Sequence, residues 1–188
     1  MTKLILASQS PRRRQILKDH GIKFKVIPGN IDEESYENLD PVEMVETLSL
    51  LKARKIAETN PDSIILAADT TVVLEKKMLS KPKSKDIAIK MLEKLSGMTH
   101  IVITGFCILD TKSGKLIISH EKTRVTFKKL EDKDINYYVE NYEVMDKAGS
   151  YAIQEGAGSF VGKMEGDYLN VVGLPSKVFN YLAKFGIK

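Results

Sequence analysis

Residues 64–68 read Ile-Ile-Leu-Ala-Ala; the polar triplet Asp69-Thr70-Thr71 follows, and then Val72-Val73-Leu74 continues the apolar run. A continuous apolar run is typical of a strand that is covered on both faces. Such strands occur mainly where helices pack on the two sides of a sheet. The segment Ser63–Leu74 therefore predicts a central strand of an α/β protein, with one carboxylate in its middle.

Helical and extended patterns alternate on both sides of this strand. A helix is expected to begin at Pro11 and to end at Gly21, and apolar residues recur at helical spacing over Pro41–Ala57. Ser84 is a good N-cap for a helix that runs to Leu95. We expect a mixed sheet flanked by helices. The other expected elements are strands over residues 4–7, 24–27, 100–109, Leu116–Phe127, 150–153 and 159–163, helices over 133–142 and 174–185, and a loop over 28–40.

Length and composition limit the class of protein. The 188 residues suit one domain, residues 1–188, and 43% of them are hydrophobic, which is enough for a core. The net charge of +4 favours an anionic partner, but nucleic acid, anionic lipid and nucleotide phosphates all remain open. Cys107 is the single cysteine and lies in an apolar run, which predicts a buried structural thiol. No apolar run reaches the roughly 18 residues of a membrane span, so we expect a cytoplasmic protein.

The sharpest local feature is the basic loop Ser8-Gln9-Ser10-Pro11-Arg12-Arg13-Arg14. It places hydroxyls, backbone amides and guanidinium groups where a strand passes into a helix. Helix N-termini attract anions, and the arginine fork matches phosphate oxygens. Exposed arginines in a first turn would oppose the helix dipole, whereas a bound polyphosphate would reverse that cost. The loop is interpreted as a phosphate site, and the alternative is a solvated basic helix end with Ser10 as its N-cap.

Two acidic features offer carboxylates. Asp69 follows the apolar run directly. Its carboxylate could bind a metal ion or orient and deprotonate a water molecule, and the alternative is an ordinary aspartate at a turn or helix N-cap. Asp32-Glu33-Glu34 reads as a solvated loop, unless the loop folds over the phosphate site and brings one carboxylate beside Asp69. Carboxylates and phosphates repel one another without a cation between them, so such a site implies a divalent ion.

Other candidates are weaker when they are taken singly. Lys52 and Lys81 read as surface lysines. Gln154 is expected to end the short strand over residues 150–153, before two glycines, where its amide could read a base edge. His100 is expected to be a polar residue at a strand edge, and the three histidines show no metal-ligand spacing.

Taken together, the motifs resemble those of the Maf-type nucleoside triphosphate pyrophosphatases. The resemblance extends over essentially the whole chain, and the order and spacing of its motifs are specific. The matching segments are Leu6-Ala7-Ser8-Gln9-Ser10-Pro11-Arg12-Arg13, Ala67-Ala68-Asp69-Thr70, Lys81-Pro82, Gly105, Ala148-Gly149-Ser150-Tyr151-Ala152-Ile153-Gln154 and Gly173-Leu174-Pro175.

The resemblance implies an elongated, twisted mixed sheet with two lobes around a central cleft. It implies cleavage of a nucleoside triphosphate between the α and β phosphates, with Mg²⁺ or Mn²⁺ as cofactor. Asp69 would be the central catalytic carboxylate and Glu33 would assist it, both with the metal and with water. The substrate-binding residues would be Ser8, Arg12, Arg13, Lys52, Thr70, Lys81 and Gln154.

The pairing of Ser-Pro-Arg-Arg with Ala-Asp-Thr resembles the branch of the family that acts on dTTP and UTP, rather than the branch that acts on 7-methyl-GTP. Ser80 departs from the usual glycine, and one small residue replaces another there. House-cleaning of non-standard nucleotides is a further role that the resemblance allows. The alternative is a nucleic-acid-binding or septum-formation regulatory protein, although Asp69 and Asp32-Glu33-Glu34 would repel a phosphate backbone without a metal. We expect no stable nucleic-acid or membrane partner, and pairing as a homodimer is left open.

Overall fold

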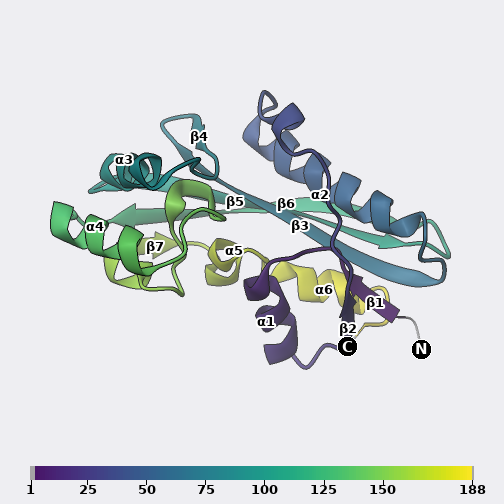
Figure 1. Ribbon diagram of the computed structural model, residues 1–188. Coiled ribbons are helices and arrows are strands. Elements are labelled where there is room, and N and C mark those ends of the chain that lie inside the picture. The colour runs from purple at the N-terminus through teal and green to yellow at the C-terminus, as the bar shows by residue number, and fades with distance from the viewer. Residues whose placement is uncertain (1–2, 188) are drawn as a thin grey trace. The chain divides into compact units, whose positions relative to one another are not determined.

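The computed structural model describes residues 3–187, and the chain divides into two compact units. Unit 1 comprises the described residues up to Asp69, together with Thr104–Glu121 and those from Gly173 onward. Unit 2 comprises Thr70–Ile103 and Lys122–Val172. Three long strands, Ser63–Leu74, Thr99–Asp110 and Leu116–Phe127, contribute residues to both units. Figure 1 shows the course of the chain, coloured by residue number.

Within the described part of the chain, seven strands pair into a mixed sheet in the order β2-β1-β3-β5-β6-β7, with β4 beside β3. The strands are β1 (Lys3–Leu6), β2 (Phe24–Val26), β3 (Ser63–Leu74), β4 (Lys77–Leu79), β5 (Thr99–Asp110), β6 (Leu116–Phe127) and β7 (Val161–Glu165). The helices are α1 (Pro11–Asp19), α2 (Pro41–Ala57), α3 (Lys85–Leu95), α4 (Asp132–Asn141), α5 (Tyr168–Val172) and α6 (Lys177–Ala183), with 3-10 turns at Glu34–Tyr36, Ala148–Ser150 and Ala157–Phe160.

In unit 1, helices cover both faces of the sheet. A Cβ atom at Gly105 would lie 2.5 Å from the carbonyl group of Val45 in α2, so only glycine allows this approach. The next side chain along β5, Phe106, lies with its ring 5.7 Å from that of Tyr181 in α6. Because consecutive side chains of a strand point to opposite faces, α2 and α6 lie on opposite sides of these strands (Figure 1). β1 pairs in parallel with both β2 and β3.

The face toward α2 explains where Asp69 points. Side chains on β3 alternate, so Ile65, Ala67 and Asp69 share one face. Ile65 and Ala67 belong to the cluster that includes Ala53 and Ile56 of α2. The same alternation therefore directs the carboxylate of Asp69 toward α2, and Lys52 immediately precedes Ala53 on that helix. The other buried members of this cluster are Ile5, Ala7 and Cys107.

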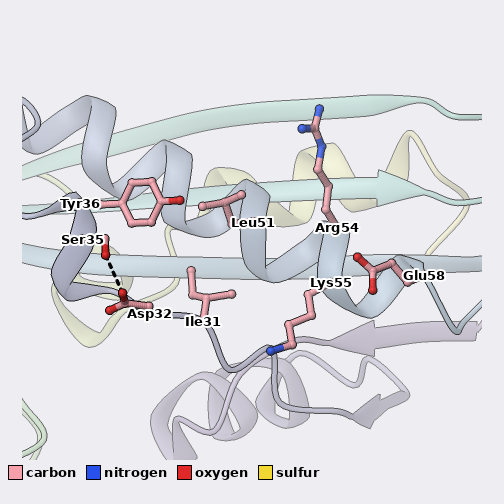
Figure 2. A pocket seen from close by; sticks show the side chains of 8 residues that line it. All are labelled: Ile31, Asp32, Ser35, Tyr36, Leu51, Arg54, Lys55 and Glu58. Carbon is pink, nitrogen blue, oxygen red and sulfur yellow. Dashed lines mark hydrogen bonds between the residues drawn. The ribbon is translucent and has the colours of Figure 1, made fainter.

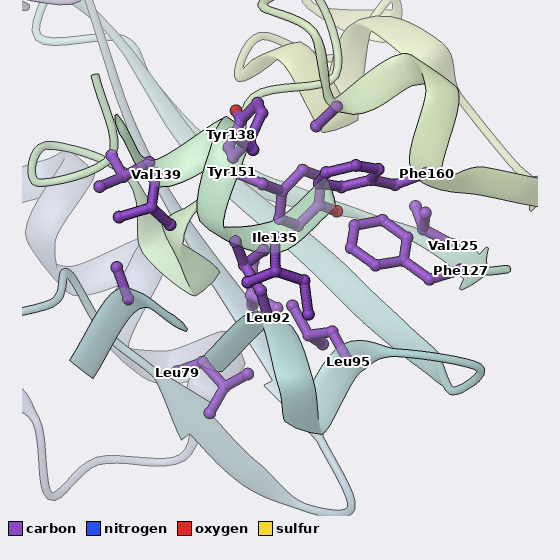
Figure 3. Packing of buried hydrophobic residues seen from close by; sticks show 14 of the residues in the cluster. Leu79, Leu92, Leu95, Val125, Phe127, Ile135, Tyr138, Val139, Tyr151 and Phe160 are labelled. Atoms are coloured by element: carbon purple, nitrogen blue, oxygen red, sulfur yellow. The ribbon is translucent and has the colours of Figure 1, made fainter. Parts of the chain in front are cut away.

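The core of unit 2 is rich in aromatic side chains, as Figure 3 shows. The ring of Phe127 lies 4.9 Å from that of Tyr151 and 5.9 Å from that of Phe160, measured between centroids. Tyr138 of α4 packs edge-on against Phe160 at 5.2 Å. Such geometries add about 0.5–1.5 kcal/mol per pair beyond the burial of area. This cluster fixes the loops that connect the short elements of unit 2.

Several expectations from the sequence are confirmed. A mixed α/β sheet flanked by helices is present, and the bounds of α2, β3 and β6 match the expected ones. The hydroxyl of Ser84 accepts a hydrogen bond from the amide of Ile87, as expected of an N-cap. Cys107 is fully buried, and burial raises the pKa of its thiol to about 12. The central cleft and the single-domain assignment remain predictions.

Other expectations are wrong. Residues 150–153 do not form a strand, because Ser150 has a φ of 64° and its amide donates to the carbonyl of Lys147 within a turn. His100 is not a polar edge residue, because β5 lies between β3 and β6 in the sheet and the histidine is fully buried. β4 and α5 are absent from the expected elements because each is too short, at 3 and 5 residues, to show a periodic pattern.

Candidate active site

A buried ammonium group joins two carboxylates in unit 1. The Nζ atom of Lys52 lies 2.6 Å from Oδ1 of Asp69 and 2.7 Å from Oε1 of Glu33. The side chains of Lys52 and Asp69 are only 10% and 12% exposed, so these charges interact with little screening by water. The expectation that Lys52 is a surface lysine is wrong, because its position on α2 faces the sheet. The structure thus brings together Asp69, Glu33 and Lys52, which are distant in sequence.

The chain between β2 and α2 is held close enough to deliver Glu33. The amide of Ile27 donates to the carbonyl of Leu6. A Cβ atom at Gly29 would lie 2.8 Å from the carbonyl oxygen of Lys52, so glycine is required where this segment passes over α2. Glu33 follows at the start of a 3-10 turn. One of the three acidic residues of the loop therefore reaches the site, as the second interpretation of that loop predicts.

The N-terminal loop forms the other side of this group in unit 1. Arg13 donates from Nε to the carbonyl of Gly173 at 2.7 Å, and from Nη1 to the carbonyl of Ala68 at 2.8 Å. Its Nη1 also lies 3.2 Å from the hydroxyl oxygen of Ser8, which is 7% exposed. The expectation that Arg13 is an exposed side chain in the first turn of the helix is therefore wrong, because its guanidinium group is hydrogen-bonded to these acceptors and is partly buried. The hydroxyl of Ser10 accepts a hydrogen bond from the backbone amide of Arg13 at 3.4 Å, so Ser10 is the N-cap of α1.

Neighbouring side chains tie the loop to the segment that carries Glu33. The side-chain amide of Gln9 donates from Nε2 to Oδ1 of Asn30 at 3.0 Å. Arg14 donates to the carbonyl of Gln9 at 2.7 Å. Arg12, Arg13 and Arg14 are all partly buried. Since Arg13 and Arg14 bind main-chain carbonyl groups, these two guanidinium groups do not form an open basic patch.

Charge in this part of unit 1 is closely balanced. Burial lowers the pKa of Arg13, while the negative charges of Asp69 and Glu33 oppose that shift and the positive charge of Arg12 adds to it. Arginine nevertheless stays protonated at any physiological pH. Arg12, Arg13 and Lys52 supply three positive charges, and Asp69 and Glu33 supply two negative ones. The group can orient a reactant, but its one excess positive charge is less than the negative charge of a polyphosphate.

Three expected site residues belong to unit 2. Thr70 follows Asp69 directly in β3 and is partly buried. Lys81 is exposed, and it lies two residues after the end of β4 and directly before the buried Pro82. Gln154 is exposed in a turn rather than at the end of a strand. Their roles remain predictions.

The carboxylate pair fits a single divalent ion of the magnesium type. Within residues 3–187, no group of three or more His, Cys, Asp or Glu side chains is placed to hold a metal. Mg²⁺, however, is commonly bound by one or two carboxylates, with water and substrate phosphates as the remaining ligands. Asp69 and Glu33 each contact Lys52 through one oxygen, and carboxylate oxygens are ligands that Mg²⁺ accepts.

A separate hollow of about 490 Å³ lies on unit 1 (Figure 2). It is formed by the segment after β2 and by the face of α2 that bears Leu51 and Arg54. None of Glu33, Lys52 and Asp69 lines it, so this hollow is not the carboxylate site. Its lining residues are Ile31, Asp32, Ser35, Tyr36, Leu51, Arg54, Lys55 and Glu58.

Comparison with known proteins defines the class to which this fold and site belong. Residues 3–185 match the family model described as Maf-like protein. The chain is 44% identical over 187 residues to a dTTP/UTP pyrophosphatase of Pelotomaculum thermopropionicum, with 99% of this chain and 98% of that protein covered. It is 46% identical to a protein of the same name from Moorella thermoacetica, covering 100% and 97%, and 48% identical to one from Alkaliphilus metalliredigens, covering 93% and 91%.

The fold is also shared with a more distant structure, that of a HAM1 protein from Coxiella burnetii. The two superpose with a TM-score of 0.54 at 15% identity, covering 98% of this chain and 100% of the other. At that identity the likeness concerns the fold alone. The match over nearly the whole chain and the close relatives are decisive: this chain belongs to the Maf family.

Within residues 3–187, none of the helices combines the length and the apolar character needed to cross a membrane.

Proposed function

We propose that this chain hydrolyses nucleoside triphosphates, with dTTP and UTP as its main substrates, to a nucleoside monophosphate and pyrophosphate. The observation that carries the proposal is the likeness to proteins named dTTP/UTP pyrophosphatase, which are 44–48% identical over nearly their whole length in the three cases given above. The geometry of unit 1 supports it, because the buried carboxylate of Asp69 and the half-buried carboxylate of Glu33 lie beside cationic side chains, an arrangement that suits phosphoryl chemistry.

In the proposed reaction, water attacks the α phosphorus and the bond from that phosphorus to the α–β bridging oxygen breaks. Asp69 accepts a proton from the attacking water, and Glu33 helps to orient that water. Lys52 keeps the two carboxylates side by side, since both bind its ammonium group. The products together contain all the atoms of the triphosphate and one water, so no other reactant is consumed.

The negative charge of the triphosphate needs positive partners. The proposed substrate-binding residues are Ser8, Arg12, Arg13, Lys52, Thr70, Lys81 and Gln154. Because Asp69 and Glu33 offset most of the positive charge of Arg12, Arg13 and Lys52, we include a divalent cation, Mg²⁺ or Mn²⁺, held by those two carboxylates. When bound, the ion would neutralise charge that develops on the phosphate oxygens.

A nucleic-acid-binding or septum-formation role is the alternative. Its main support from sequence is the run Arg12-Arg13-Arg14, and the inward hydrogen bonds of Arg13 and Arg14 weaken that support. The curated relatives bear enzyme names, which favours the hydrolase. House-cleaning of non-standard nucleotides is compatible with the same site. A cytoplasmic location is proposed because nucleoside triphosphates are present there.

The test is a panel of nucleoside triphosphates incubated with Mg²⁺ or Mn²⁺ and followed by phosphorus NMR. We expect pyrophosphate and monophosphate in equal amounts, with dTTP and UTP consumed fastest, and no turnover when EDTA removes the metal. Release of orthophosphate together with a nucleoside diphosphate would refute cleavage between the α and β phosphates. Equal rates for purine and pyrimidine nucleotides would refute the proposed preference.

A further inference from the structure

Unit 2 contains a second buried lysine that joins two carboxylates. Lys147 is 3% exposed, and its Nζ lies 2.7 Å from Oδ1 of Asp146 and 3.0 Å from Oε2 of Glu155. A buried ammonium group is unfavourable unless it is paired, so this lysine needs its partners. The ion pair with Glu155 joins the two ends of a turn whose exposed residue is Gln154.

The backbone of this turn is held at several other points. The amide of Ala152 donates to the hydroxyl of Tyr138 at 3.0 Å, and the amide of Glu155 donates to the carbonyl of Ala152 at 3.0 Å. The hydroxyl of Tyr151 lies 2.7 Å from Nε2 of His100, and both side chains are buried. Figure 3 shows Tyr138 and Tyr151 together within the aromatic cluster. The residues on either side of Gln154 are thus fixed to the core while its amide stays exposed.

The start of the turn is also conformationally demanding. Gly149 has a φ of 67°, with the Val72 side chain about 3.1 Å from where its Cβ would lie. Ser150 has a φ of 64°, which is uncommon for a residue with a side chain, and it is fully buried. Backbone held in sparsely populated conformations persists only where the surroundings impose it, and such positions cluster at ligand sites. The surroundings here include the ion pairs of Lys147.

We propose that Lys147 is a positioning residue: through its ion pair with Glu155 it holds Gln154 in the orientation in which its amide meets the nucleotide. The contact between Gln154 and substrate rests on the proposed function. A turn whose backbone is already held in place loses less conformational freedom when the substrate binds. Removal of the lysine therefore weakens substrate capture more than it slows the chemical step.

The first arm of the test measures the turn itself and needs no activity. Hydrogen exchange at the amides of Ala152 and Glu155 is compared among the parent protein, Lys147→Met and Lys163→Met. Lys163 is the matched control, because it forms an ion pair with Glu165 at 3.1 Å in the same unit but is 66% exposed. We expect exchange at both amides to speed up at least tenfold in Lys147→Met and to stay unchanged in the control. Unchanged exchange in Lys147→Met would overturn the proposal.

The second arm is a double-mutant cycle on the hydrolysis of UTP. We expect Lys147→Met to lower kcat/KM about tenfold, mostly through KM, and to have less than a twofold effect when Gln154 is already alanine. An equal loss in both backgrounds would mean a purely structural lysine. No effect of Gln154→Ala alone would also overturn the proposal. If Lys147→Met does not fold, Glu155→Gln replaces it in both arms.

The two arms separate the possible failures. A parent protein that releases no pyrophosphate from UTP refutes the proposed function, whereas the exchange measurement still decides whether Lys147 holds the turn.

Discussion

Lys52 in unit 1 and Lys147 in unit 2 are alike in their immediate contacts. Each is a buried ammonium group within 3.0 Å of two carboxylate oxygens. One partner of each lysine is half-buried to the same extent, Glu33 at 36% and Glu155 at 35% exposed, whereas the other differs: Asp69 is 12% exposed and Asp146 is 54% exposed. A buried lysine between two acids is therefore not diagnostic of catalysis.

The surroundings distinguish the two groups. Near Lys52, Arg13 binds the carbonyl of Ala68, directly before Asp69, and its charge interacts with that carboxylate. Near Lys147, the chain forms a tight turn anchored to an aromatic core. We infer that the first group holds reactive carboxylates and that the second holds a recognition side chain in place.

The largest expected effect follows from removing the charge of Asp69. We expect Asp69→Asn to lower kcat for UTP by about 100-fold or more, because general-base and metal-ion catalysis each contribute several kcal/mol. The fold should survive, since asparagine is nearly isosteric and Lys52 keeps its contact with Glu33. Steady-state turnover beside a thermal melt measures both. The matched control is Asp146→Asn, which removes an acid from the Lys147 group and should lower kcat less than threefold.

Loss of Arg13 is expected to act on stability as well as on activity. Arg13→Ala removes the donors to the carbonyls of Gly173 and Ala68, at a cost of about 1–3 kcal/mol for each buried acceptor left unpaired. For a chain of this size each kcal/mol shifts the melting temperature by about 2–4 °C, so the two losses together should lower it by roughly 4–24 °C. Lys18→Ala, an exposed position on the same helix, is the control and should leave the melt unchanged. A normal melt for Arg13→Ala would contradict the inward position of its guanidinium group.

A smaller effect is expected when the pH is lowered, because acid reduces the stability of unit 2. Burial lowers the pKa of His100 to about 4 from an ordinary value of 6.5. Between these values the unfolded chain binds the proton more readily, so the stability contributed by neutral His100 is complete above pH 6.5 and is lost as the pH falls toward 4. From pH 7 to pH 5 the loss should be about 2 kcal/mol. Urea unfolding at the two pH values measures it.

The control for acid sensitivity is a pair of histidine variants. His100→Gln should reduce the difference in stability between pH 7 and pH 5 by most of that amount, whereas His20→Gln, at an exposed position, should preserve it. An equal pH dependence in the parent and in His100→Gln would show that other groups account for the loss.

The sequence predicts the main elements well because their signals are local. The apolar run of β3 and the helical spacing of α2 both gave bounds that match the structure. Short elements such as β4, and the turn at Ser150, were missed or misassigned because tertiary contacts rather than local pattern determine them. Residue types and motifs predict most of the residues of the site, but they do not predict the hydrogen bonds and ion pairs that connect them.

The burial of Lys52 and the inward hydrogen bonds of Arg13 illustrate that difference. Both depend on residues far away in sequence: Asp69 for the lysine and Gly173 for the arginine. A lysine on a helix gives no local sign that a carboxylate from a strand will meet it. Gly29 gives a weak sign, because a glycine next to proline in a loop is common, yet here it permits the close approach to Lys52.

The most direct test of the central claim is to determine kcat and KM for UTP separately in Lys52→Met and Lys147→Met, with thermal melts of the same preparations. If Lys52 holds reactive carboxylates and Lys147 holds Gln154, Lys52→Met should lower kcat at least tenfold, while Lys147→Met should raise KM and change kcat by less than threefold. The same pattern of change in both variants, or a loss of kcat only in Lys147→Met, would contradict the account.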